Sequence, residues 1–246
     1  MKDCIVITGV GKGFGAELFK YFIQKYHVIG LTRSVEDIEL LNNSFSSYSE
    51  NFNLFAVDVT DRLNVLAILT PFINNNYFSI FGLINNAGVR SRKSIEDLDI
   101  LDFERIASVN LFAPIYLSKL LLPGMQSLKR GRIINISSII SVNALPDLSA
   151  YAVSKAGLDG FTRSLTAEYA HLGITCNSIL PGFCETSYFP TFKNKSDLYN
   201  MTLLRTPAQR WGKSSELVGI CDLLLGNSGG YINGVSIPVD GGWTAC

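Results

Sequence analysis

Residues 8–15, TGVGKGFG, join a short apolar run (CIVI) to a helical pattern (AELFKYFIQKY). Backbone N–H groups at the start of a helix form a natural site for an anion such as a phosphate. Gly9, Gly13 and Gly15 lack the Cβ atoms that would keep a pyrophosphate from the backbone, or the helix from the strand. The spacing G-x-x-x-G-x-G alone also suits a plain turn with a helix cap. Its position directly after the first strand favours a dinucleotide-binding loop.

Short apolar segments alternate with longer helical patterns along the whole chain. This alternation is typical of an α/β protein whose parallel sheet is covered by helices on both faces. The polar stretch at 42–51 is interpreted as a loop, and no linker rich in Pro, Gly or Ser divides the chain. We therefore expect a single doubly wound domain over residues 1–246. Its strands are expected at 4–8, 27–31, 53–57, 81–85, 132–136, 174–179 and 235–239.

The composition excludes several classes of protein. Lys plus Arg and Asp plus Glu number 21 each in the 246 residues, so the net charge suggests neither a nucleic-acid nor a membrane surface. No apolar run reaches the roughly 18 residues that span a bilayer, and the N-terminus lacks the features of a signal peptide. Five scattered cysteines and two distant histidines give no metal site or disulfide framework. We expect a cytoplasmic protein with reduced thiols and no metal.

The end of the second strand predicts which dinucleotide is bound. An acidic residue there would hydrogen-bond the adenosine ribose of NAD, but this strand ends in Thr32 and Arg33. The first acids, Glu36 and Asp37, are expected to lie too far along the chain. Arg33 is able to pair with a 2′-phosphate, and Lys12 in the glycine loop supplies a second cation. Taken singly, each is better explained as an ordinary solvated cation, but together, with no acid at the strand end, they favour NADP(H).

A second group of residues suggests proton-transfer chemistry. Tyr151 and Lys155 are four residues apart at the start of a helix and therefore share a face. An ammonium nearby would stabilise a phenolate and let Tyr151 exchange a proton with a substrate oxygen. The fifth strand ends at Ser137 and Ser138, and we expect Ser138 to orient a carbonyl. Asn110, a polar residue among apolar neighbours, would hold a water near Lys155, although a purely structural side chain is the alternative.

The whole chain, without a gap, resembles the short-chain dehydrogenase/reductase family in its short single-domain branch. The matching motifs are TGVGKGFG at 8–15, DV at 58–59, NNAG at 85–88, Asn110, Ser138, Tyr151, Lys155, PGFCET at 181–186 and VDGGW at 239–243. The resemblance implies a cofactor site made of Gly9, Gly11, Lys12, Gly13, Phe14, Gly15, Thr32, Arg33, Asp58, Val59, Asn86, Ala87, Gly88, Tyr151, Lys155, Pro181, Gly182 and Thr186.

The same resemblance implies the fold and the reaction. The fold is a Rossmann fold with seven parallel strands in the order 3-2-1-4-5-6-7. The reaction is hydride transfer between NADP(H) and a carbonyl or alcohol: Tyr151 exchanges the proton, Lys155 binds the nicotinamide ribose, Ser138 polarises the carbonyl and Asn110 anchors a relay water. Members are usually homodimers or homotetramers, and the helices near 101–122 and 151–170 would form that contact.

The substrate is expected beside a lid at about 186–212, with Tyr188 and Arg92 among the binding residues together with Ser138 and Tyr151. Arg90, Arg92 and Lys93 follow the NNAG motif, where a guanidinium would bind a carboxylate or phosphate. The C-terminal part resembles the branch acting on sugar acids and polyols, such as gluconate 5-dehydrogenase. A 3-oxoacyl-acyl-carrier-protein reductase is the alternative. A non-catalytic NADP-binding regulator is disfavoured because Tyr151 and Lys155 are both present.

Overall fold

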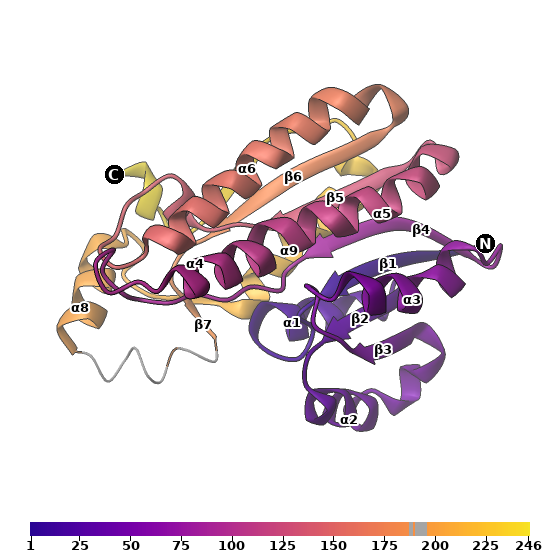
Figure 1. The fold of residues 1–246 in the computed structure, drawn as a ribbon, viewed down its shortest axis with the longest axis horizontal. Coiled ribbons are helices and arrows are strands. Elements are labelled where there is room, and N and C mark those ends of the chain that lie inside the picture. Colours follow the sequence, from indigo (N-terminus) through magenta and orange to yellow (C-terminus); the bar gives the residue numbers. More distant parts are fainter. Residues whose placement is uncertain (187–188, 190–195) are drawn as a thin grey trace.

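The apolar segments of the sequence form one parallel sheet in the computed structural model, which describes residues 1–186, 189 and 196–246. The sheet order is β3-β2-β1-β4-β5-β6-β9, the seven-stranded order that the family resemblance implies (Figure 1). Each predicted strand is present, with ends shifted by at most a few residues. The strands are β1 (Lys2–Thr8), β2 (His27–Thr32), β3 (Phe52–Ala56), β4 (Phe78–Asn85), β5 (Gly131–Ile136), β6 (Ile174–Pro181) and β9 (Ser236–Val239).

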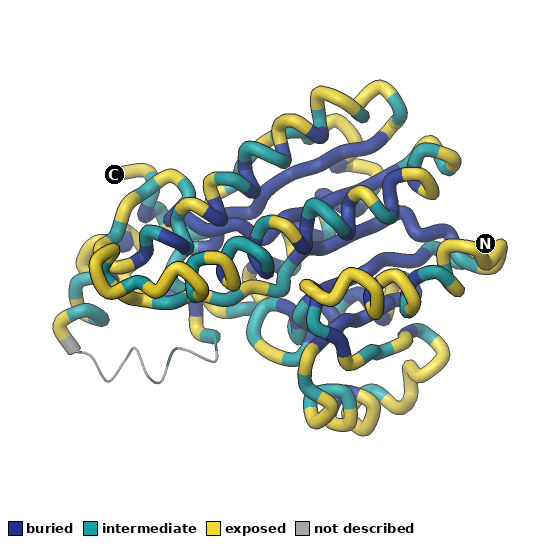
Figure 2. The backbone as a smooth tube through the Cα atoms, viewed as in Figure 1, coloured by how far each residue is buried: buried dark blue, intermediate teal, exposed yellow. Residues whose placement is uncertain are grey.

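Helices cover both faces of this sheet, and Figure 2 shows the strands buried between helices with exposed outer sides. Successive side chains of a strand point to opposite faces. In β1, Ile5 and Ile7 belong to the hydrophobic core beneath the first set of helices, whereas Cys4 and Val6 belong to the core beneath the second. The first set is α1 (Gly13–Phe22) and α9 (Val218–Leu225); the second is α3 (Arg62–Ile73), α5 (Ala113–Leu128) and α6 (Ser149–Tyr169).

The helical segment Ile100–Leu128 is long and apolar enough, by length and composition, to cross a membrane. It comprises α4 (Ile100–Ala107), a π-helical turn (Ser108–Phe112) and α5. Half of its most apolar window is buried inside the fold. Leu117, Leu121 and Met125 of α5 are at most 2% exposed and pack in the core with β1 and β4. The apolar composition is thus explained by burial against the sheet.

A small parallel pair of strands lies beside the main sheet and is not predicted by the sequence. It joins β7 (Cys184–Glu185) to β8 (Gly212–Lys213), and so ties together the two ends of the expected lid. Within that segment the structure describes Phe189 and α8 (Ser196–Arg205). Tyr188 lies outside the described residues. Among the described residues, α2 (Val35–Ser44) lies next to β3.

Candidate active site

The carboxyl ends of the parallel strands open into a cleft of about 710 Å³. Ligands of open α/β sheets bind at this edge. The predicted residues that line the cleft are Gly9, Gly11, Lys12, Gly13, Phe14, Thr32, Arg33, Asp58, Val59, Asn86, Ala87, Gly88, Arg92, Ser138, Tyr151, Lys155, Pro181, Gly182 and Thr186. Gly15 and Asn110 are not part of the lining. Both lie immediately behind it.

The glycine loop owes its shape to two left-handed residues and two close contacts. Gly9 and Gly13 have φ angles of +72° and +57°, in the left-handed region that favours glycine. A Cβ on Gly9 would lie 3.0 Å from the Cα of Ala87, and a Cβ on Gly15 would collide with the carbonyl oxygen of Gly9. Side chains at these positions would therefore push the loop away from β4 and the helix away from the loop. The predicted reason for the glycines agrees with this packing.

Asn86 supports the loop from the neighbouring strand. Its Nδ2 donates to the backbone oxygens of Thr8 and Gly9, each at 3.0 Å. The backbone N–H groups of Asn86 and Ala87 both donate to Oγ1 of Thr8, at 3.0 and 2.9 Å. The amide of Asn86 is thus committed to holding β1 and β4 together. Its contribution to a cofactor site is the position of the glycine loop.

Two loose ion pairs mark the far end of the cleft. The ammonium of Lys12 lies 3.8 Å from Asp37, and the guanidinium of Arg33 lies 3.9 Å from Asp58. The side chains of Lys12 and Arg33 are 68% and 64% exposed, so these pairs are weak. Partial burial of Asp58 is outweighed by hydrogen bonds from Thr60 and by the charge of Arg33, so its pKa lies below the ordinary value. Both cations remain able to accept a second anionic partner.

Asp37 is a cleft residue that the sequence analysis missed. The expectation that the first acids lie too far along the chain fits Glu36, which accepts a hydrogen bond from Ser34 at 2.8 Å and does not line the cleft. Asp37 instead lies against Gly11 and is only 14% exposed. Its backbone N–H is capped by the hydroxyl of Ser34 at 3.0 Å. The S-x-x-D spacing is a capping signal and places Asp37 in the first helical turn, at the sheet edge.

Lys155 and Tyr151 lie on one face of α6 at the centre of the cleft. The Lys155 side chain is 4% exposed; its Nζ donates to the backbone oxygen of Ile136 at 2.7 Å and lies 5.7 Å from the centre of the Tyr151 ring. Burial lowers the pKa of Lys155 from 10.5 to about 8, and the carboxylate of Asp159 partly opposes this shift. Lys155 therefore stays mostly protonated at neutral pH but loses its proton more readily than an exposed lysine.

The two adjacent serines have different roles in the structure. Ser137 donates its hydroxyl to the backbone oxygen of Lys155 at 3.3 Å and thus helps to anchor α6. Ser138 begins a short helical turn, and its Oγ accepts from the N–H of Ile140 at 3.2 Å. That bond uses Ser138 as an acceptor and leaves its hydroxyl proton to be donated toward the cleft. Of the pair, Ser138 is placed to orient a carbonyl.

Asn110 sits in the π-helical turn between α4 and α5 and is fully buried. Its Oδ1 accepts from the N–H of Val89, and its Nδ2 donates to the carbonyl of Val89, both at 2.8 Å, and to Ser154 at 3.1 Å. The side chain is therefore occupied by protein groups. Any water that Asn110 anchors must be held through its backbone. Single π-helical turns often occur at functional sites because they redirect the backbone.

A chain of buried polar groups fixes α6 over the sheet and was not foreseen from the sequence. Asn85 donates to Asn135 at 2.8 Å, Asn135 donates to Thr162 at 2.8 Å, and Thr162 lies 2.8 Å from Ser178. These groups connect β4, β5, α6 and β6. The Oδ1 of Asn85 has no hydrogen-bond partner among the described residues, so the network is satisfied only from Asn135 onward, and its buried hydrogen bonds help to rigidify the core. This network therefore holds the helix that carries Tyr151 in register with the strand ends.

Of the three basic residues after the NNAG motif, two line the cleft and one lies outside it. Arg90 and Arg92 line the cleft. Arg92 lies 3.9 Å from Asp147, beyond hydrogen-bonding distance, and its side chain is 34% exposed. Lys93 points elsewhere, because its ammonium pairs with Asp102 of α4 at 3.0 Å. An anion in the cleft would thus meet the arginines and not the lysine.

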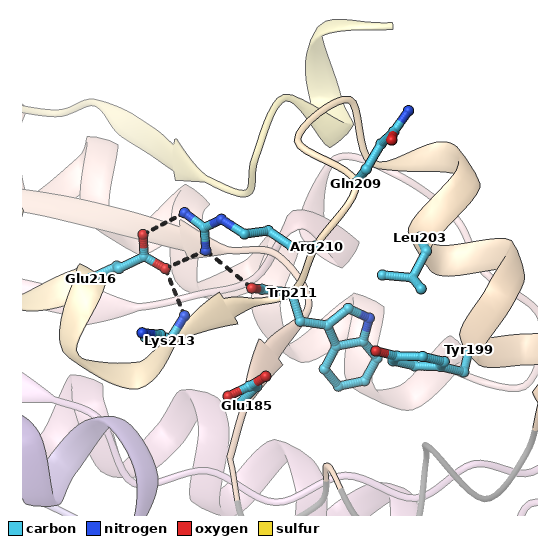
Figure 3. Close-up of a pocket in the computed structure, with 8 residues that line it drawn as sticks. All are labelled: Glu185, Tyr199, Leu203, Gln209, Arg210, Trp211, Lys213 and Glu216. Carbon is cyan, nitrogen blue, oxygen red and sulfur yellow. Dashed lines mark hydrogen bonds and ion pairs between the residues drawn. The ribbon is translucent and has the colours of Figure 1, made fainter.

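A second cavity, of about 440 Å³, lies behind the lid segment and shares Trp211 with the cleft (Figure 3). Two of its charged side chains are paired: Arg210 forms two bonds to Glu216, at 2.8 and 2.7 Å, and Glu216 also accepts from the backbone N–H of Lys213. This cavity contains none of the predicted catalytic or cofactor residues. Its importance is structural, since its groups hold one wall of the cleft.

Comparison with known proteins shows which family the chain resembles over almost its whole length. Residues 3–197 match the family described as short chain dehydrogenase. The chain is 31% identical over 243 residues to a 3-oxoacyl-acyl-carrier-protein reductase of Buchnera aphidicola, covering 98% of this chain and 97% of that protein. It is 28% identical over 240 residues to the gluconate 5-dehydrogenase of Gluconobacter oxydans, covering 97% and 93%. A solved gluconate 5-dehydrogenase of Burkholderia cenocepacia, in complex with NADP and tartrate, is similar with a TM-score of 0.92, 28% identity and coverage of 99% and 96%.

Proposed function

The chain belongs to the short-chain dehydrogenase/reductase family of oxidoreductases, and we propose that it interconverts a carbonyl and a secondary alcohol with NADP(H). One observation carries this proposal: Tyr151 and the buried Lys155 share one helical face at the carboxyl edge of the sheet, in a cleft that also contains the glycine loop. Bound cofactor would supply or accept a hydride at its nicotinamide.

The cleft residues fit a dinucleotide. The left-handed backbone at Gly9 and Gly13 shapes the loop that precedes the first turn of α1, where a pyrophosphate would bind the backbone N–H groups. Lys12 and Arg33 would bind the 2′-phosphate, each exchanging a weak carboxylate pair for a phosphate. The NADP present in the Burkholderia cenocepacia structure supports the same choice. The other predicted lining residues would complete the cofactor site.

Four residues would perform the proton chemistry. Tyr151 would give its hydroxyl proton to the carbonyl oxygen in reduction and take it back in oxidation. The Lys155 ammonium beside the ring would stabilise the phenolate that remains and would hold the nicotinamide ribose. Ser138 would donate a hydrogen bond to the same substrate oxygen. Asn110 would act through its backbone, and through the positions of Val89 and Ser154, to return protons from solvent.

We propose a small anionic hydroxy or oxo compound as the substrate, with its anionic group at Arg92. A sugar acid or polyol is the candidate that the sequence resemblance favours. A 3-oxoacyl thioester on a carrier protein is the alternative, and relatives of both kinds match nearly the whole chain. Tyr188 is proposed to contribute from the lid at about 186–212.

We further propose that the chain is a cytoplasmic single-domain protein that assembles into a homodimer or homotetramer. Exposed apolar side chains occur on the outer sides of the helices expected to meet in such an assembly: Phe112 is 49% exposed and Val153 is 56% exposed. Packing two copies against this surface would remove these side chains from water. Size measurement in solution tests this part of the proposal.

The test of the reaction is NADPH oxidation by the purified chain with a panel of ketones, keto acids and acetoacetyl thioesters. Tyr151→Phe should reduce turnover by about 10²- to 10⁴-fold, the usual contribution of a general acid, while the affinity for NADPH stays nearly unchanged. Tyr231→Phe is the matched control because Tyr231 is fully exposed and lies outside the cleft. Undiminished turnover in Tyr151→Phe would refute the assigned mechanism.

A further inference from the structure

The part of the cleft next to Tyr151 and Ser138 has a strongly apolar wall. Tyr151 packs on a hydrophobic cluster built on Leu148 that also includes Leu145 and Phe183. The apolar side chains that line the cleft at this end are Val89, Ile140, Leu145, Leu148, Phe183, Leu198 and Trp211. Among the described residues, Ser138, Tyr151, Arg90 and Arg92 are the polar lining side chains that we place beside the substrate. Ser34 and Asp37 line the cofactor end, and the hydroxyl of Ser137 is bonded to the backbone oxygen of Lys155.

This wall is held rigidly in place. Trp211 is 7% exposed, its Nε1 donates to Thr202 at 2.9 Å, and its ring centre lies 5.3 Å from that of Phe183 and 5.6 Å from that of Tyr199. Figure 3 shows the indole of Trp211 beside the Tyr199 ring, with Arg210 on the other side. Arg210 donates to the backbone oxygen of Trp211 at 3.1 Å. These contacts fix the orientation of Trp211, and its indole N–H is already bonded to Thr202.

Among the described residues, the polar groups of a polyol would find few partners at this end of the cleft. Each hydroxyl that leaves water without a hydrogen bond costs free energy, and a sugar acid carries several hydroxyls along its chain. Ser138 and Tyr151 are both needed at the reacting oxygen, so they do not serve the others. Arg90 and Arg92 are cations at the mouth and are suited to one anionic group. An alkyl or aryl group, in contrast, gains free energy when it is buried against Leu145, Phe183 and Trp211.

From this lining we infer that the substrate has an apolar skeleton that carries the oxo or hydroxy group, and a single anionic group at its other end that meets Arg92. This inference rests on the proposed function and narrows its substrate class away from sugar acids and polyols. In reduction, a C–H bond forms at the carbonyl carbon with the hydride of NADPH, and Tyr151 protonates the oxygen. NADP⁺ and a secondary alcohol are the products.

The experiment measures kcat/KM for NADPH oxidation by the full chain with three sets of substrates. The first is a series of straight-chain 4-oxo acids with successively longer alkyl ends. The second is a matching series of 3-oxoacyl N-acetylcysteamine thioesters, which separates free acids from carrier-bound acyl groups. The third is 5-ketogluconate, a polyhydroxylated keto acid with the same charge as the first set.

The inference predicts that kcat/KM rises about fourfold for each added methylene until the wall is covered. It also predicts that 5-ketogluconate is reduced at least about tenfold less efficiently than the best 4-oxo acid. A flat dependence on chain length, or a preference for 5-ketogluconate, would overturn the inference while leaving the proposed function intact. NADPH binding without turnover of any ketone would instead refute the proposed function.

Two pairs of variants locate the effect. Leu145→Asn should flatten the dependence on chain length, whereas Val142→Asn, at a 59% exposed position outside the cleft, should keep it. Arg92→Ala should raise KM for the oxo acids about tenfold or more and leave neutral methyl ketones unaffected. Lys93→Ala should change neither, because Lys93 pairs with Asp102 outside the cleft. A steep dependence on chain length in Leu145→Asn would contradict the assigned wall.

Discussion

Replacing Lys155 by methionine should change how the stability of the cofactor-free protein depends on pH. Lys155 is 4% exposed, and burial lowers its pKa from 10.5 to about 8. In the unfolded chain the same group has an ordinary lysine pKa. Between these two values the unfolded chain binds more protons than the folded one, so stability rises with pH in this range. The penalty for holding the ammonium in the fold is complete below pH 8 and disappears above pH 10.5.

The size of the effect follows from the difference between the two pKa values. It corresponds to about 3 kcal/mol of unfolding free energy at pH 7. By pH 9.5 most of this penalty is relieved, so the free energy of unfolding of the wild type should rise by about 2 kcal/mol relative to Lys155→Met over this interval. Loss of the bond to the oxygen of Ile136 shifts the variant by a constant amount and does not alter the slope.

The assay is urea unfolding of both proteins, without cofactor, from pH 7 to 9.5. Burial raises the pKa values of Cys4, Cys176 and Cys184 to about 12. As pH rises above 9 these thiols ionise in the unfolded chain but not in the fold, so the folded protein loses stability. The loss occurs in both proteins and cancels in the difference. Lys119→Met, at an exposed position of α5, is the matched control and should follow the wild type at every pH.

A difference that stays constant from pH 7 to 9.5 would refute this reasoning. It would mean that the fold stabilises the ammonium as well as water does. The buried carboxylate of Asp159, one helical turn from Lys155 and 4% exposed, would be the group responsible. Asp159→Asn in the wild-type background would then restore the pH dependence.

Two further predictions concern the cofactor end of the cleft. Asp37→Asn should increase the preference for NADPH over NADH about twofold to tenfold, because it removes a negative charge 3.8 Å from Lys12. The preference is measured as a ratio of dissociation constants. An unchanged ratio would show that Asp37 does not influence binding of the 2′-phosphate. Gly15→Ala should destabilise the chain by about 1–3 kcal/mol and weaken NADPH binding, because its Cβ collides with the glycine loop. Gly124→Ala in α5, where a Cβ meets nothing within 4 Å, should instead stabilise by about 0.5–1 kcal/mol. Equal effects of the two alanine substitutions in thermal unfolding would contradict the packing argument.

The main sheet was predictable because its strands are apolar runs separated by long helical patterns. Fully buried parallel strands carry this signal in composition alone, as β2 and β5 do. The β7–β8 pair was not predictable, since strands of two residues have no periodicity to detect. Its existence depends on two segments, at 184–185 and 212–213, meeting only after the chain has folded.

The candidate site was predictable where function depends on the end of a strand or the start of a helix. Gly9, Ser138 and Tyr151 all occupy such positions, so topology alone brings them together. Asp37 was missed because its role depends on the direction of a side chain after a helix cap. The partners of Asn135 were missed because hydrogen bonds between distant strands leave no pattern in the sequence.

The two ends of the cleft are built in different ways, and this has a consequence for specificity. The cofactor end is made by loops directly attached to β1, β2 and β4, whose backbone positions are fixed by the sheet. The substrate end draws on Leu145, Phe183, Leu198 and Trp211, which are far apart in sequence and meet beside α6. The β7–β8 pair fixes both ends of the segment that carries Leu198. Substitutions between these ends are therefore free to reshape the substrate wall while Tyr151 and Lys155, anchored by the strands and by α6, keep their chemistry.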